Sequence, residues 1–267
     1  MSLETLQRDP ELEAVLGRYM NECTLRGPVY AFTQTGSTME DAHELAEQGA
    51  PEGTLVYAIR QAQGRGRLGR VWESPEGGAY FSIILRPRRP TADIPQLSLV
   101  TGLAAVEGIR QLVRIYPSIR WPNDVLIDGK KVCGILTEST QHPAPSTQSC
   151  VLIGVGINVM TKPSDLPDTA TSLSAVVNNC PHPHQVTGAL WRRLSTWYDI
   201  WSREGFAPIR AALRPWMGHF GQPVHITAGT SRFEGTAADL DESGRLVVRL
   251  DSGVLRAFEM GEVTLLR

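Results

Sequence analysis

Cysteine is scarce in this 267-residue sequence: the four cysteines, Cys23, Cys133, Cys150 and Cys180, are widely spaced and form no Cys-x-x-Cys pair. This spacing excludes a disulfide scaffold and fits a reducing compartment, where thiols act as small apolar residues. Long apolar runs are also missing, since none approaches the roughly 18 residues of a membrane-spanning helix. The opening residues, MSLETLQRDP, lack the basic and apolar segments of a signal peptide. We therefore expect a cytoplasmic protein with no membrane partner.

An excess of charge of one sign is absent as well. The formal net charge is −2, with 20% charged and 42% hydrophobic residues. This composition is typical of an ordinary globular protein, and it gives no overall attraction to nucleic acid or to a membrane. A strongly charged segment in this chain is therefore a local feature with its own cause.

One such segment lies between Gln61 and Arg70, where glycines at 64, 66 and 69 are interleaved with arginines at 65, 67 and 70. The glycines match the dinucleotide-binding fingerprint by letter, but that motif opens a helix and has an acidic residue about 20 positions later. Here the run leads into Ser-Pro-Glu-Gly-Gly, and residues 82–89 contain no Asp or Glu. No Gly-Lys-Ser/Thr follows, which also excludes a P-loop.

Three interpretations of this segment are left: a solvated basic turn, an RGG-type RNA-binding patch, and a loop that closes over an anionic ligand. RNA-binding patches of this kind occur in low-complexity repeats, whereas this is a single copy between predicted strands. Backbone amides and guanidinium groups can together hold an anion. We favour the ligand-closing loop.

The hydrophobic periodicity predicts a mixed α/β fold. Residues 11–21, 38–48, 94–113, 184–203 and 205–216 are expected helices, and residues 29–33, 54–58, 80–85, 118–127, 130–140 and 151–159 are expected strands. A loop rich in Pro, Ser, Thr and Gln covers 141–149. From Gly218 onward, short alternating strands separated by Gly and Asp turns predict a small β-barrel. We therefore expect a short helical extension (1–27), a catalytic domain (28–217) and a C-terminal barrel (218–267).

Three further motifs carry residues suited to chemistry. Ser37 and Thr38 stand at a predicted helix start, where they either cap the helix or donate to an oxygen-rich ligand. Arg120-Trp-Pro-Asn-Asp124 precedes a predicted hairpin that carries Lys130 and Lys131; adjacent strand residues face opposite sides, so only one lysine can point inward. In the run 154–158, Gly-Val-Gly-Ile-Asn, two glycines within a strand suggest close approach of another backbone or a ligand.

In their order and spacing, these motifs resemble those of biotin protein ligases. The family pattern has Ser-Thr, then Gln-x-x-Gly-Arg-Gly-Arg-x-Gly-Arg-x-Trp, then Lys-Trp-Pro-Asn-Asp, then Lys-(Leu/Val)-x-Gly-Ile-Leu, then Gly-x-Gly-Ile-Asn. The resemblance covers residues 28–267 and implies a mixed β-sheet flanked by helices, like the class II aminoacyl-tRNA synthetase/biotin ligase catalytic domain, with an SH3-like C-terminal β-barrel. The chain departs from the pattern at Arg120, where the family has Lys, at Met39, where it has Asn, and at Cys133, where it often has Ala.

The resemblance implies a ligase that activates biotin with ATP as biotinyl-5′-AMP and transfers it to a lysine of a biotin carboxyl carrier domain, with Mg²⁺ on the phosphates. The implied catalytic residues are Lys131, Arg65 and Arg67. The implied biotin-binding residues are Ser37, Thr38, Gln61, Gly64, Arg65, Gly66, Arg67, Lys131 and Gly134. The implied ATP- and adenylate-binding residues are Arg70, Trp72, Arg120, Asn123, Asp124, Gly154, Gly156 and Asn158. The metal ligands are not assigned.

Two alternatives stay open at this point. One is a lipoate or octanoate ligase of the same fold, although the Gly-Arg run and the C-terminal barrel favour biotin. The other is a non-catalytic biotin-sensing protein, although Lys131 is retained. Residues 1–27 are too short for a helix-turn-helix domain, so we expect no DNA binding. A homodimer through the exposed sheet is an expectation from the resemblance alone.

Overall fold

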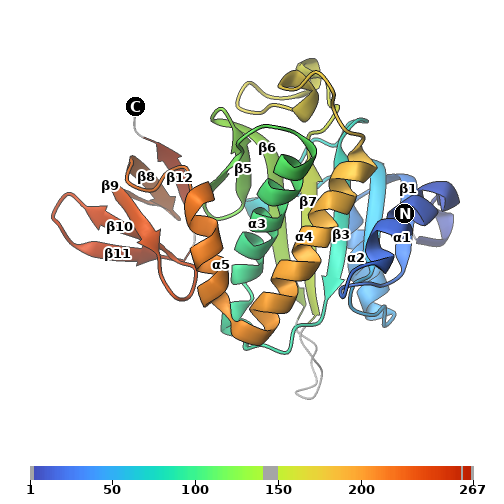
Figure 1. Ribbon diagram of the computed structural model, residues 1–267, viewed down its shortest axis with the longest axis horizontal. Coiled ribbons are helices and arrows are strands. Elements are labelled where there is room, and N and C mark those ends of the chain that lie inside the picture. The colour runs from blue at the N-terminus through green and yellow to red at the C-terminus, as the bar shows by residue number, and fades with distance from the viewer. Residues whose placement is uncertain (1–2, 141–149, 260, 266–267) are drawn as a thin grey trace.

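The computed structural model describes residues 3–140, 150–259 and 261–265. Its centre is a seven-stranded sheet in which β1 and β2 are parallel and the other neighbours are antiparallel (Figure 1). In spatial order the strands are β1 (Val29–Thr35), β2 (Leu55–Gln61), β3 (Ala79–Leu85), β7 (Cys150–Ile157), β6 (Lys130–Thr140), β5 (Asp124–Ile127) and β4 (Ser118–Arg120). The predicted mixed sheet is therefore confirmed.

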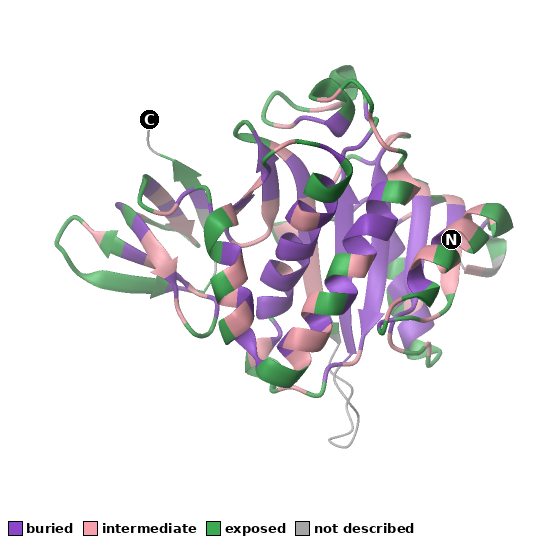
Figure 2. Cartoon of the chain, in the orientation of Figure 1, coloured by how far each residue is buried: buried purple, intermediate pink, exposed green. Residues whose placement is uncertain are grey.

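The helices divide unequally between the two faces of this sheet. The helices are α1 (Pro10–Asn21), α2 (Thr38–Glu47), α3 (Gln96–Leu112), α4 (Pro183–Glu204) and α5 (Phe206–Leu213). The large core cluster joins α1, α3, α4 and α5 to one face, here called the helix face, whereas a smaller cluster joins α2 to the other. Strands and inward helix surfaces are buried, and the outward helix surfaces are exposed (Figure 2).

Local signals explain the helix starts. Asp9 precedes α1, its carboxylate accepts a hydrogen bond from the Leu12 amide at 3.0 Å, and Pro10 takes the first helical position. Ser37 precedes α2, but its side chain makes no capping hydrogen bond. Ser37 thus takes the predicted N-cap position, but the interpretation of its side chain as a cap is wrong, because its buried hydroxyl bonds to no helix amide.

The predicted strand over 118–127 is wrong. The chain turns at Trp121–Asn123, so β4 and β5 form an antiparallel pair in which Ser118 faces Leu126. Pro122, Asn123 and Asp124 interrupt the apolar pattern, and the antiparallel pairing of β4 with β5 shows that this break is a reversal of the chain. The last predicted helix is also shorter, since α5 ends at Leu213 and a 3₁₀ turn follows. The predicted loop 141–149 lies outside the described residues.

The C-terminal residues form a five-stranded antiparallel sheet, in the order β11-β10-β9-β8-β12, that fits the expected SH3-like module. The strands are β8 (Pro223–Ala228), β9 (Ser231–Leu240), β10 (Leu246–Leu250), β11 (Leu255–Phe258) and β12 (Glu262–Leu265). This sheet lies beside α5 (Figure 1). Asp239 forms ion pairs with Arg210 at 2.8 Å and Arg214 at 3.1 Å, which fasten β9 to the helical layer.

Candidate active site

A small cavity of about 50 Å³ lies on the face of the sheet that α2 shares. Its lining combines polar, cationic and apolar groups from α2, the segment after β2, and strands β6 and β7. The lining residues are Ser37, Thr38, Met39, Gln61, Arg65, Gly66, Arg67, Trp72, Asn123, Lys131, Gly134, Ile135, Leu136, Gly154, Val155 and Gly156. Most of the predicted site residues are thus brought together. Gly64, Arg70, Arg120, Asp124 and Asn158 are not among the lining residues.

The arginine-glycine segment folds as a hairpin, here called the arginine hairpin (residues 61–74). Its two limbs meet at the bridges Gln61–Ser74 and Arg65–Val71, and the Gly66 amide donates to the Arg70 carbonyl at 2.8 Å. A Cβ at Gly64 would lie 2.3 Å from the Trp72 carbonyl oxygen, so only glycine lets the limbs approach this closely. At the tip, Leu68 adopts a φ of 56° and its side chain is exposed.

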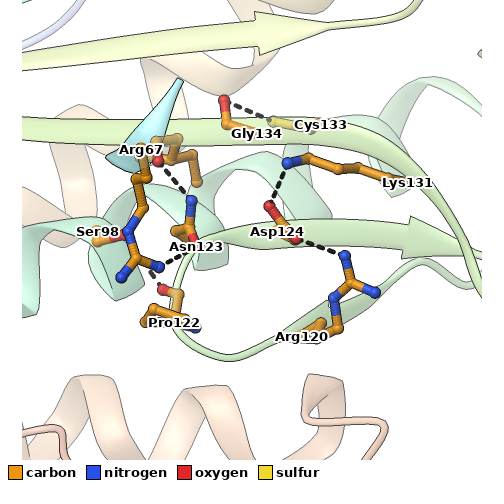
Figure 3. Close-up of polar contacts among 10 residues, drawn as sticks. Arg67, Ser98, Arg120, Pro122, Asn123, Asp124, Lys131, Cys133 and Gly134 are labelled. Atoms are coloured by element: carbon orange, nitrogen blue, oxygen red, sulfur yellow. Dashed lines mark hydrogen bonds and ion pairs between the residues drawn. The ribbon is translucent and has the colours of Figure 1, made fainter. Parts of the chain in front are cut away.

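Two arginines attach this hairpin to the sheet. Arg65 Nη2 donates to Glu138 Oε1 on β6 at 2.9 Å. Arg67 Nη1 donates to Asn123 Oδ1 at 2.7 Å (Figure 3). Arg70 is exposed at the base of the tip, and its backbone carbonyl closes the turn. The hairpin therefore carries guanidinium groups to the cavity from two directions.

Lys131 is the inward lysine of the pair, as the strand geometry requires, and Lys130 is exposed. Lys131 Nζ lies 2.6 Å from Asp124 Oδ1, and Arg120 Nη2 lies 2.6 Å from Asp124 Oδ2 (Figure 3). One carboxylate thus holds two cations from opposite sides. This arrangement keeps the ammonium at the cavity wall and directs the Arg120 guanidinium to Asp124.

Each residue of the turn 121–123 makes a hydrogen bond to another part of the chain. Trp121 Nε1 donates to the Gly244 carbonyl, in the turn between β9 and β10, at 3.1 Å. Ser98 Oγ donates to the Pro122 carbonyl at 3.2 Å, and Asn123 Nδ2 donates to the Ile135 carbonyl at 2.9 Å (Figure 3). The Asn123 amide therefore has a fixed orientation, with its oxygen turned to Arg67.

The glycines of β6 and β7 make room for side chains rather than for another backbone. A Cβ at Gly156 would lie 2.4 Å from Trp72 Nε1, and one at Gly134 would lie 2.7 Å from Trp72 Cζ3. Lys131 Nζ lies 5.1 Å from the centre of the Trp72 ring, within cation–π range. A Cβ at Gly154 would lie 2.8 Å from Met39 Sδ. The glycines do allow close approach, but the predicted backbone neighbour is wrong, because the space is taken by an indole and a thioether.

A polar chain organises the start of α2. Gln61 Oε1 accepts hydrogen bonds from the Thr38 amide at 2.9 Å and from Thr38 Oγ1 at 3.1 Å, while Gln61 Nε2 donates to Ser74 Oγ at 2.8 Å. Thr38 Oγ1 also lies 2.8 Å from Ser82 Oγ. Within the described residues the Ser37 hydroxyl has no hydrogen-bond partner, although it is buried. It is therefore suited to bind a polar ligand atom.

Asn158 lies behind the cavity. Its Nδ2 donates to the Thr171 carbonyl at 3.1 Å, and its amide donates to the Val132 carbonyl at 2.8 Å. These bonds join the end of β7 to β6 and to the segment after it. In this structure Asn158 therefore supports the strand that presents Lys131.

Burial shifts two titratable groups near the site. Desolvation raises the pKa of Asp41 in α2 to about 6, against a lowering contribution from a Thr35 hydrogen bond. Desolvation also raises the pKa of the Cys133 thiol to about 12, which keeps it protonated at neutral pH. Cys133 is thus an inert packing group, as expected.

Sequence reasoning missed several residues of the site. Met39 and Leu136 give the cavity an apolar wall, and Ser82 and Glu138 bond to residues that line it. Leu136 and Glu138 follow Gly134 at even spacing on β6, so strand alternation could have placed them on the same face. Nothing in the sequence pairs Glu138 with Arg65.

The comparisons with known proteins agree with this geometry. Residues 29–158 match the Biotin/lipoate A/B protein ligase family, and residues 219–266 match the Biotin protein ligase C terminal domain. The biotin–[acetyl-CoA-carboxylase] ligase of Paracoccus denitrificans is 34% identical over 227 residues, which cover 82% of this chain and 93% of that protein. The chain belongs to the biotin protein ligase family.

Two other members of the biotin protein ligase family extend the comparison. The bifunctional ligase/repressor BirA of Bacillus subtilis is 39% identical over 227 residues, covering 83% of this chain and 69% of that protein. The solved biotin protein ligase from Aquifex aeolicus, in complex with biotin and ATP, superposes with a TM-score of 0.77 at 31% identity. That superposition covers 90% of this chain and 98% of the other.

Proposed function

We propose that this biotin protein ligase family member activates biotin with ATP and transfers the biotinyl group to a lysine of a carrier domain. The observation that carries the proposal is the cavity in which Lys131 and the arginine hairpin meet the buried, unpartnered Ser37 hydroxyl. Cations for a carboxylate and phosphates thus lie beside polar and apolar groups suited to a small heterocycle and its chain. The relatives named as biotin ligases and the Aquifex complex with biotin and ATP support the same assignment.

In the first step, a biotin carboxylate oxygen attacks the α-phosphorus of ATP, and pyrophosphate leaves with the electrons of the broken P–O bond. Two anions have to approach one another, so positive charge at the cavity lowers the barrier. We assign this role to Lys131, Arg65 and Arg67, with Arg70 and Arg120 in the surrounding positive field. Thr38, Gln61, Gly64, Gly66 and Gly134 would shape the biotin subsite, and Trp72, Asn123, Asp124, Gly154, Gly156 and Asn158 the nucleotide side.

In the second step, a carrier lysine amine attacks the biotinyl carbonyl, an amide bond forms, and AMP leaves. Lys131 would stabilise the oxygen that gains negative charge during the attack. The mixed anhydride also reacts with water, so a hairpin that lies over the cavity protects it. The arginine hairpin has the position for this role.

Mg²⁺ fits this site as an ion brought by the nucleotide. In the part of the chain that the structure describes, no three His, Cys, Asp or Glu side chains lie close enough to hold a metal. Mg²⁺ in nucleotide sites keeps several waters and is bound largely by phosphate oxygens. When bound, it would neutralise the triphosphate, and Lys131 and the arginines would act on the remaining charge.

The carrier, the compartment and the assembly are further parts of the proposal. A biotin-dependent carboxylase domain is the acceptor that the name of the Paracoccus relative suggests. The four cysteines are free, which fits a reducing cytoplasm. No helix among the described residues is long and apolar enough to cross a bilayer. A homodimer stays a prediction, and light scattering would test it by measuring the mass of the protein in solution.

One assay tests the function directly. The protein is incubated with ATP, labelled biotin and a biotin carboxyl carrier domain, with unlabelled lipoate as a competitor in a parallel sample. We expect label on the carrier lysine, release of pyrophosphate, and no competition by lipoate. Label transfer that lipoate abolishes would support the lipoate-ligase alternative. Binding of biotin without pyrophosphate release or transfer would support the non-catalytic alternative.

A further inference from the structure

Glu138 is a carboxylate beside the cavity that the proposed chemistry does not use. It lies on β6, two residues beyond Leu136 and four beyond Gly134, and so projects from the same face as those cavity-lining residues. Its Oε1 lies 2.9 Å from Arg65 Nη2. The side chains of Arg65 and Glu138 are 44% and 33% exposed, so the pair lies at the rim of the cavity.

The contact between Arg65 and Glu138 matters because it helps to hold the arginine hairpin in place. The arginine hairpin is attached to the sheet on one side through Arg65 and Glu138, and on the other through Arg67 and Asn123. Gly66 separates the two arginines and resists rotation little. Ala62 and Gln63 stay bonded to the carbonyls of Thr35 and Gly36, so loss of either arginine attachment loosens the tip of the hairpin and leaves its base in place.

A bond to Glu138 does not withdraw Arg65 from ligand binding. A guanidinium group has five N–H donors in a planar fork. One edge can donate to Glu138 while the other donors address an anion in the cavity. The hydrogen bond to Glu138 thus limits where the Arg65 guanidinium group can lie.

We propose that Glu138 is a positioning residue that fastens the arginine hairpin over the acyl-adenylate through Arg65, and so limits its escape before transfer. This inference rests on the proposed function. Glu138 would contact neither biotin nor ATP. Its effect would be on how long the hairpin stays closed, and therefore on the ratio of adenylate lost to adenylate transferred.

The expected effect is modest because the pair is partly exposed. Ion pairs of this kind shift an equilibrium by about twofold to fivefold. Replacing the carboxylate should therefore raise the open fraction of the hairpin by that factor. The rate of adenylate formation should change less than the partition ratio, because the cavity cations stay in place.

The experiment compares Glu138→Gln, Glu138→Asp and a matched control, Glu76→Gln, in the full chain. Glu76 pairs with Arg60 on β2, is exposed, and lies outside the cavity lining, so its variant removes a similar ion pair elsewhere. Two quantities are measured. The first is amide hydrogen exchange of residues 62–73 in the protein without substrates. The second is the ratio of free biotinyl-AMP to biotinylated carrier.

We expect Glu138→Gln to raise both exchange and the partition ratio by about twofold to fivefold, with Glu138→Asp between it and the wild type and Glu76→Gln unchanged. Equal values for Glu138→Gln and the wild type would overturn the proposal. So would faster exchange without greater loss of adenylate, or a loss of adenylate formation itself. If the wild type made no adenylate, the proposed function would fail, whereas the exchange comparison would still test the Arg65–Glu138 attachment.

Discussion

The two faces of the seven-stranded sheet are built from the same strands in opposite ways. On the helix face, β7 presents Val151, Ile153, Val155 and Ile157, all in the large core cluster. On the other face the same strand presents Cys150 and Leu152 under α2, then Gly154 and Gly156 under Met39 and Trp72. On this face, β7 therefore has side chains under α2 and none at the two glycines that line the cavity.

This difference shows how one sheet serves both stability and chemistry. The helix face is filled with branched side chains, whose burial stabilises the fold. The cavity face gives up that burial along part of β6 and β7, and an indole, a thioether and an ammonium group lie where side chains at the glycines would otherwise stand. Changes on the helix face should therefore alter stability, and changes on the cavity face should alter activity.

The largest expected effect separates the two adjacent lysines of β6. Lys131→Ala should reduce adenylate formation by about 100-fold or more, because it removes a cation from the place where charge develops. It also leaves Asp124 with one cationic partner instead of two. Lys130→Ala, on the exposed side, should keep nearly full activity. Labelled pyrophosphate release measures both. A Lys131→Ala protein as active as Lys130→Ala would exclude the proposed role.

Adding a methyl group on the cavity face and, in a second variant, removing one from the helix face tests the comparison directly. Gly156→Ala places a Cβ 2.4 Å from Trp72 Nε1, so the flexible indole has to shift; we expect about a tenfold loss of activity with little change in Tm. Ile153→Val removes a methyl from the helix face and should cost about 0.5–1.5 kcal/mol of unfolding free energy with activity preserved. Urea unfolding and the adenylation assay measure both. If Gly156→Ala lowered the stability and Ile153→Val lowered the activity, the comparison between the two faces would be wrong.

The dependence of Tm on pH tests the burial of Asp41, which lies on α2. Its pKa is raised from 3.8 to about 6 by burial, so the ionised carboxylate is less stable in the folded protein than in the unfolded chain. This penalty is absent below pH 3.8, grows between 3.8 and 6, and is complete above 6. Asp41→Asn should therefore raise Tm at pH 7.5 by a few degrees, about 2–4 °C for each kcal/mol, and leave it unchanged at pH 4. A Tm difference independent of pH would contradict the assignment.

The smallest effect is expected at Arg120. Its guanidinium bonds to Asp124 and does not line the cavity, so Arg120→Lys keeps the charge next to the same carboxylate. We expect less than a twofold change in the KM for ATP, because partly exposed ion pairs contribute little. Steady-state kinetics at varied ATP concentration measures this. A large increase in KM would mean that the planar fork itself contacts the nucleotide.

Much of the fold and of the site followed from local patterns. The continuous apolar run of β7, the helical spacing of α3 and the residues within each motif all depend on residues near one another in sequence. The prediction that Lys130 and Lys131 face opposite sides of the strand also needed only strand geometry. These predictions succeeded because the physical cause lies within a few residues.

The rest depended on contacts between distant segments. The turn at 121–123 is held by hydrogen bonds from Trp121 to Gly244 and from Ser98 to Pro122, which no local pattern predicts. Glycines at 134 and 156 indicated close approach, but only the fold identifies Trp72 as the neighbour. Glu138 looked like an ordinary polar strand residue until β6 and the arginine hairpin were placed side by side.

The indole bond from Trp121 to Gly244 also has a consequence for biosynthesis. Its two partners are 123 positions apart in sequence. A growing chain therefore completes the sheet strands well before it makes the carbonyl that anchors the turn carrying Asn123 and Asp124. Domains tend to fold from the N-terminus during synthesis. The turn that carries Asn123 and Asp124 would thus gain this hydrogen bond only after the segment between β9 and β10 has been synthesised.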